Sequence, residues 1–179
     1  MKKPVMTLAE VDALAEAAHA GQFDKIGVPY IEHVRAVAAG LAPFGDELVM
    51  AGFLHDVIED TDWTADQLRG AGVPDHVVAL VEAVTNERGV TYEEKVARIT
   101  GQGRDAVLLK VADNAHNSHP DRAAQLPEEK RTRLAAKYRT ARDILWPAVE
   151  GRGIETIVQI VNPSLLDELR ERQSAGSPA

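Results

Sequence analysis

Length, composition and charge place this sequence among ordinary folded domains. Its 179 residues are 45% hydrophobic and 27% charged, which fits one globular domain and argues against a disordered chain or a fibrous repeat. Cysteine is absent, so disulfides, thiolate zinc sites and a cysteine nucleophile are excluded, and a formal net charge of −8 argues against nucleic-acid binding.

The amino-terminal stretch carries no targeting pattern. It begins with the basic residues MKK, but Glu10, Asp12 and Glu16 interrupt the apolar core that a signal peptide needs. No apolar run approaches the roughly 20 residues that span a bilayer. We therefore expect a cytoplasmic protein that does not associate with membranes, and the absence of cysteine fits a reducing compartment.

Helix signals recur from one end of the chain to the other. Capping-box patterns mark four helix starts, at Thr7, Thr64, Thr91 and Ser164. Apolar residues then recur at spacings of three and four, whereas sustained alternation and hairpin turn signals are absent from the sequence. The prediction is a compact, single-domain, all-α fold with helices over 7–20, 29–42, 46–60, 64–69, 75–86, 91–101, 104–118, 128–146 and 164–173.

The stretch LHDVIEDTD, residues 54–62, carries the strongest chemical signal. On a helix, setting His55 at zero places Glu59 near 40°, Asp56 near 100° and Asp60 near 140°, so all four share one face. Carboxylates about 6 Å apart repel by roughly 3 kcal/mol, so this face needs a cation or raised pKa values. A bound divalent metal meets that need most directly. Gly52 falls on the same face and leaves room either for a ligand or for a crossing helix.

An adjacent His-Asp pair cannot complete a metal site, so further ligands must come from other segments. His33, in GVPYIEHVRAV, is one candidate, although a single histidine on a half-buried face is more often structural. Asp113, in LLKVADNAHN, is the other, because it shares a polar helix face with Lys110 and Asn117. His116 turns off that face and is expected to be a hydrogen-bonded structural histidine.

Together, His33, the pair His55-Asp56 and the distant Asp113 resemble the signature of the HD superfamily of metal-dependent phosphohydrolases. Within it, GQFDKIGVPYIEHV, FLHDVIEDT and LLKVADNAHN are similar, in order, to three blocks of the small, hydrolase-only RelA/SpoT homologues. The resemblance covers roughly residues 7–145. It implies a helical HD-type domain over residues 1–150, and residues 151–179 are then expected to be an extension with a short helix and a frayed tail.

By this resemblance, His33, His55, Asp56 and Asp113 ligate one manganese ion, with another divalent metal as an alternative. The resemblance also implies that Glu59 and Asp60 orient and deprotonate the attacking water. The reaction is then the release of pyrophosphate from the 3′ position of (p)ppGpp by a metal-bound water. Family members with two metals use extra histidines between the His-Asp pair and the last aspartate, and only His76 lies there, which favours one metal.

The same resemblance implies a nucleotide pocket with five contacting residues: Lys25, Tyr30, Lys110, Asn117 and Tyr138. The family's Arg-Lys pair reads Asp24-Lys25 here, and the basic residue usual soon after the asparagine is missing, so a planar cation is lost. Open alternatives are therefore another nucleotide, such as a nucleoside monophosphate or NADPH, or a nucleotide and metal sensor without turnover. The expected partner is a small anionic nucleotide, with a homo-oligomer possible.

Overall fold

The computed structural model describes residues 5–175, and within them the chain folds as helices with no strand beyond one isolated bridge between Phe23 and Pro29. The helices and 3₁₀ turns follow in this order: α1 (Leu8–Ala18), α2 (Ile31–Leu41), η1 (Ala42–Phe44), α3 (Asp46–Leu54), α4 (Val57–Asp60), α5 (Ala65–Ala71), α6 (Asp75–Val84), α7 (Tyr92–Thr100), α8 (Arg104–Asn117), α9 (Pro120–Ala123), α10 (Glu128–Leu145), η2 (Trp146–Ala148), α11 (Gly151–Val161), η3 (Pro163–Leu165) and α12 (Leu166–Ala175). The predicted all-α class is confirmed.

Three of the four predicted capping boxes start helices. Thr7, Thr64 and Thr91 each accept a hydrogen bond from the backbone three residues later, and the residue there returns one to the cap. The fourth prediction was wrong, because α12 starts at Leu166. Ser164 lies inside the preceding 3₁₀ turn, two residues before the start of α12, and its hydroxyl donates to Asn162 Oδ1.

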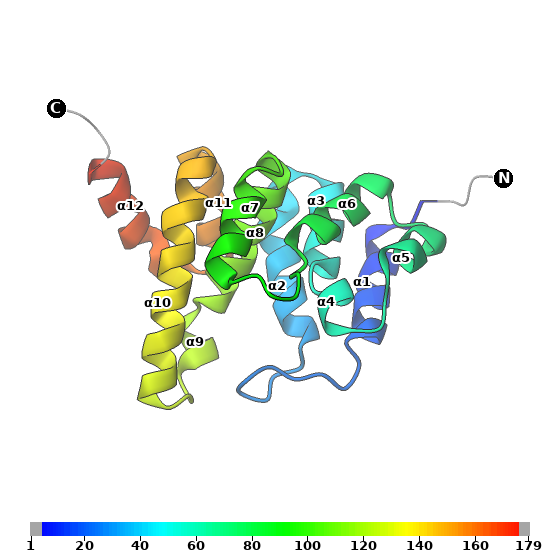
Figure 1. Ribbon diagram of the computed structural model, residues 1–179, viewed down its shortest axis with the longest axis horizontal. Coiled ribbons are helices and arrows are strands. Elements are labelled where there is room, and N and C mark those ends of the chain that lie inside the picture. The colour runs from blue at the N-terminus through cyan, green and yellow to red at the C-terminus, as the bar shows by residue number, and fades with distance from the viewer. Residues whose placement is uncertain (1–4, 176–179) are drawn as a thin grey trace.

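The core forms where α2, α3 and α8 meet, and α11 closes it from the other side (Figure 1). Fully buried apolar side chains from all four helices fill it, among them Leu41, Leu54, Leu108 and Ile157. The stretch from residue 151 is therefore a helix that belongs to this core. The predicted boundary at residue 150 falls between two helices that share one hydrophobic cluster. The end predicted to be frayed, SAGSPA over 174–179, is helical at Ser174 and Ala175, which belong to α12, and residues 176–179 lie outside the described residues.

The predicted helix over 46–60 was wrong in one respect, because it breaks at the chemical motif. Helix α3 ends at Leu54, His55 and Asp56 form a turn, and α4 begins at Val57. The ring of His55 reaches back and donates from Nδ1 to the Gly52 carbonyl at 2.8 Å. Asp56 has ψ near −2°, which turns the chain out of the helical path. The break places the two side chains by a turn and not by helical phase.

Gly52 lies where α3 crosses α2, so of the two alternatives left open by the sequence, a ligand or a crossing helix, the structure shows the crossing helix. A Cβ there would lie 2.7 Å from Ala38 Cα and 2.9 Å from Ala38 N, both backbone atoms. The glycine therefore allows the two helices to approach at backbone contact.

We expect Gly52→Ala to lower the free energy of unfolding by about 2–3 kcal/mol, because α2 and α3 must separate to admit the methyl group. Urea unfolding followed by circular dichroism measures this. Gly70→Ala is the matched control, since a Cβ at this helical position meets nothing within 4 Å. Equal stability of the two variants would contradict the packing account.

Candidate metal centre and substrate cleft

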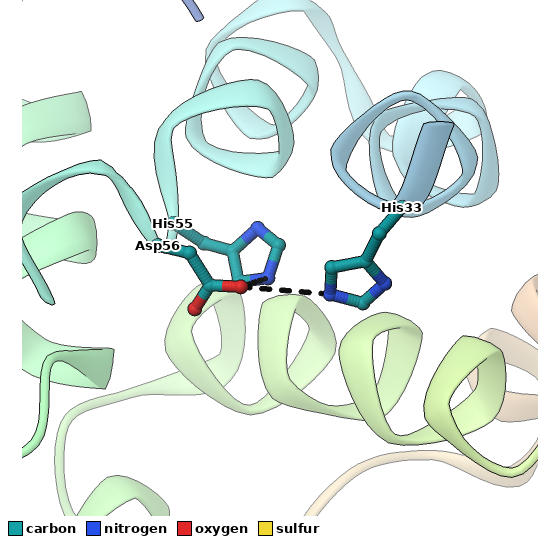
Figure 2. A group of neighbouring side chains, drawn as sticks. All are labelled: His33, His55 and Asp56. Carbon is teal, nitrogen blue, oxygen red and sulfur yellow. Dashed lines mark ion pairs between the residues drawn. The ribbon is translucent and has the colours of Figure 1, made fainter. Parts of the chain in front are cut away.

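The predicted His-Asp pair meets a histidine from a neighbouring helix. His33 extends from α2, and His55 and Asp56 from the turn after α3, so that their ligand atoms all lie within 4.8 Å of one another (Figure 2). Asp56 Oδ2 is 3.0 Å from His55 Nε2 and 3.5 Å from His33 Nε2. Both imidazoles are buried. The structure thus brings the adjacent pair His55-Asp56 together with His33, which lies 22 residues earlier in the sequence.

The fourth predicted ligand, Asp113, joins this cluster from α8. Its Oδ1 lies 3.2 Å from His33 Nε2 and 3.6 Å from His55 Nε2. Lys110 donates to Oδ2 at 2.6 Å and Asn117 donates to Oδ1 at 2.5 Å, so the carboxylate is held from both sides. Burial alone would raise the pKa of Asp113, but Lys110 and the two histidines hold it well below its usual range.

His55 shows that these residues fit a cation. Because Nδ1 donates to the Gly52 carbonyl, the lone pair of neutral His55 lies on Nε2, which is buried and forms no hydrogen bond. This atom faces the carboxylates of Asp56 and Asp113. The nitrogen lone pair and the carboxylate oxygens are all hydrogen-bond acceptors, so a proton or a metal ion must lie between them. Two neutral imidazoles and two carboxylates are nitrogen and oxygen donors suited to a divalent first-row metal.

His33 is oriented by His116, which the sequence predicted to point away from the polar face of its helix. Its Nδ1 lies 2.7 Å from Nδ1 of His116, so a proton on one ring is shared with the other. Burial, followed by the neighbouring His33, lowers the pKa of His116 to about 3, so His116 is neutral and its Nδ1 can accept the hydrogen bond in one tautomer. His33 then donates from Nδ1 and keeps the Nε2 lone pair for the cluster. The expectation of a hydrogen-bonded His116 is confirmed.

We expect the affinity for Mn²⁺ to rise with pH, because the ion competes with a proton on His55. Burial favours the neutral ring, but Asp56 and Asp113 outweigh it and raise the pKa of His55 to about 10. A raised pKa keeps the proton bound through the neutral range, so the affinity should fall about tenfold for each pH unit of acidification. Titration calorimetry in buffers of different ionisation enthalpy measures the proton release. Metal binding without proton release would contradict this.

The two acids after the His-Asp pair differ in their surroundings. Glu59 accepts from the backbone and the side chain of Asn86 and pairs with Lys95 Nζ at 3.3 Å. Asp60 forms no ion pair within residues 5–175, and burial, followed by the charges of Asp56 and Glu59, raises its pKa. A carboxylate of raised pKa without a cationic partner is suited to accept a proton.

A cleft of about 380 Å³ opens beside the metal centre, and all five predicted substrate residues line it. Tyr30 donates to Asp56 Oδ2 at 2.7 Å and so holds a predicted metal ligand. Lys110 and Asn117 lie against Asp113. Lys25 and Tyr138 also line the cleft, and Tyr138 is buried. His76 lies elsewhere, exposed and near Asp105.

Sequence reasoning missed several residues of this cleft: Phe23, Asn86, Tyr92, Lys95, Arg122 and Lys137. Arg122 is the most informative, because it pairs with Asp24 at 3.3 Å and approaches Asn117. Asp24, which stands where the family resemblance has an arginine, therefore pairs with a guanidinium from α9 that also lines the cleft. Asp24 and Arg122 are far apart in the sequence, so no local pattern predicted their pairing.

An all-helical domain that holds a buried histidine and aspartate cluster at the head of a charged cleft has the architecture of a metal-dependent hydrolase. Within the described residues, no helix is both long enough and apolar enough to cross a membrane.

A model of the HD domain family matches residues 12–140, and the chain belongs to this family. The structure is similar, with a TM-score of 0.71 and 25% identity, to a solved metazoan orthologue of SpoT described as hydrolysing ppGpp; the match covers 97% of this chain and 98% of that one.

Curated bacterial relatives agree with this assignment. The chain is 37% identical over 155 residues to the guanosine-3′,5′-bis(diphosphate) 3′-pyrophosphohydrolase of Haemophilus influenzae, covering 80% of this chain and 22% of the relative. It is 33% identical over 168 residues to the bifunctional (p)ppGpp synthase/hydrolase SpoT of Escherichia coli, covering 86% and 23%. It is 32% identical over 174 residues to a GTP pyrophosphokinase of Streptomyces coelicolor, covering 87% and 20%. This chain spans about a fifth of the length of these relatives.

Proposed function

We propose that this protein is a manganese-dependent phosphohydrolase that removes pyrophosphate from the 3′ position of (p)ppGpp. The observation that carries the proposal is the convergence of His33, His55, Asp56 and Asp113 beside the unpaired acid Asp60 at the head of the cleft. The hydrolase names of the relatives and of the similar solved structure support the choice of substrate.

The reaction balances with one water. The water oxygen bonds to the phosphorus attached to the ribose 3′ oxygen, that P–O3′ bond breaks, and the 3′ oxygen leaves with a proton as pyrophosphate is released. When bound to the four ligands, the divalent ion supplies positive charge for the phosphoryl oxygens and acidifies the attacking water. Asp60 accepts a proton from this water, since its carboxylate has no cationic partner within residues 5–175.

Glu59 supports the reaction by positioning other residues of the cleft, whereas Asp60 accepts the proton. Its carboxylate holds Asn86 and Lys95, and so fixes one wall of the cleft next to the metal centre. Tyr30 orients the carboxylate of Asp56, and Asn117 orients the carboxylate of Asp113, each by donating a hydrogen bond to it. Lys25 and Tyr138 contact the nucleotide beyond the reacting phosphate.

A substrate panel tests the proposal. The purified protein is incubated with Mn²⁺ and with ppGpp, nucleoside monophosphates or NADPH, and the products are separated by chromatography. The expected result is release of pyrophosphate and GDP from ppGpp, abolished by EDTA. Turnover of NADPH or of a monophosphate alone would keep the hydrolase and replace the substrate. Binding of ppGpp without any turnover would indicate a sensor.

A further inference from the structure

Five cationic side chains line the cleft, and they differ in whether a carboxylate pairs with them. Three are neutralised by a carboxylate: Lys95 by Glu59 at 3.3 Å, Lys110 by Asp113 at 2.6 Å and Arg122 by Asp24 at 3.3 Å. The other two, Lys25 and Lys137, form no ion pair with any carboxylate of residues 5–175. The cleft is lined by five acids as well as five cations, so what sets Lys25 and Lys137 apart is that neither amine is held by a carboxylate among residues 5–175.

The two lysines approach the cleft from different elements. Lys25 lies in the loop between α1 and α2, next to Asp24, whose carboxylate accepts from the backbone of Ile26 and Val28 at 2.9 Å each. Lys137 lies on α10, with its Nζ 4.2 Å from the centre of the Tyr92 ring. This loop and α10 are far apart in the sequence, and residues of both line the same cleft. Both lysines are exposed residues of the cleft, and neither is held by a carboxylate of residues 5–175.

Neighbouring positive charges act on both ammonium groups, and Lys137 is one of those that act on Lys25. Burial, followed by the charge of Lys137, lowers the pKa of Lys25, and burial, followed by the charge of Lys110, lowers the pKa of Lys137. Like charges that are brought together and partly withdrawn from water destabilise the empty site. An anion with several oxygen atoms removes this cost by accepting hydrogen bonds from both amines.

We propose that Lys25 and Lys137 form a second phosphate subsite, which holds a phosphate group of the substrate other than the one that reacts. This inference rests on the proposed function: the metal centre engages the phosphate that is cleaved, and the lysine pair takes the phosphate at the far end of the nucleotide. For ppGpp that group is the 5′-diphosphate. The substrate class is thus a nucleotide with two separate phosphate groups.

The subsite is tested first by binding alone. Inorganic pyrophosphate is titrated calorimetrically into the protein in EDTA, so that no metal contributes and no turnover occurs. Lys25→Gln and Lys137→Gln should each weaken binding about five- to tenfold. Arg139→Gln, which removes an exposed charge two residues along α10, should leave binding unchanged. No saturable binding by the wild-type protein at millimolar pyrophosphate, or equal losses in all three variants, would overturn the subsite.

Kinetics then assign the subsite to the phosphate that does not react. Lys137→Gln should raise the KM for ppGpp about tenfold with little change in kcat. The KM for guanosine 3′-diphosphate, which lacks the 5′ phosphates, should stay at the wild-type value. An equal rise in KM for both compounds would assign the lysines to the reacting phosphate and overturn the proposal. If the wild-type protein hydrolyses neither compound, the proposed function fails, while the pyrophosphate titration still decides whether the lysines bind an anion.

Discussion

Replacing Asp56 with asparagine is expected to lower metal-dependent hydrolysis by about a thousandfold or more, because the amide cannot supply the charge that a divalent ion requires. Asp56 Oδ2 faces the Nε2 atoms of both His33 and His55, so this one atom touches two other ligands of the centre. Release of pyrophosphate from ppGpp in Mn²⁺ measures the effect.

The same variant should also lose the stabilisation that manganese gives to the wild-type protein, since an ion that binds only the folded state raises the melting temperature. Asp62→Asn is the matched control, because Asp62 is exposed in the same acidic stretch and lies outside the cleft. Full manganese-dependent activity in Asp56→Asn would remove Asp56 from the metal centre.

Asp60→Asn is expected to lower kcat by about a hundred- to ten-thousandfold, which is the contribution of a positioned general base. The change preserves side-chain shape and removes the carboxylate that would accept the proton of the attacking water. Asp60 lies outside the group of ligand atoms, so Mn²⁺ affinity should stay close to that of the wild-type protein. Single-turnover kinetics with ppGpp, combined with a manganese titration, separate the two quantities.

Glu59→Gln gives the comparison that tests the division of labour between the two acids. Glutamine can still accept from Asn86 but loses the ion pair with Lys95, so the cleft wall loosens while the base remains. We expect a smaller loss of kcat than in Asp60→Asn, together with a higher KM. A larger loss of kcat in Glu59→Gln would reverse the two roles.

The sequence predicted well what depends on neighbouring residues. The capping boxes at Thr7, Thr64 and Thr91 each rest on two side chains three residues apart, and all three form. The residues of the metal cluster come together as the family resemblance implied, with His33 and Asp113 meeting the His-Asp turn. Motifs of this kind carry their chemistry in short blocks, so one sequence is enough to find them.

The features that the sequence did not predict depend on distant residues or on tertiary context. The break after Leu54 requires the His55 ring to bond the Gly52 carbonyl, which competes with the strong helical periodicity of this stretch. The pairing of Asp24 with Arg122 joins a loop to a short helix much later in the chain. Neither feature leaves a local pattern, because each depends on how the helices pack.

The backbone contact at Gly52 has a consequence for the metal centre. Gly52 and Ala38, which touch across the α2–α3 crossing, lie about one turn from His55 and His33 respectively. The distance between the two imidazoles is therefore set by how closely two helices can approach, and only secondarily by side-chain rotamers. The separation of α2 and α3 at their crossing therefore limits the space between the two histidines, and Gly52 sets that separation because it has no side chain.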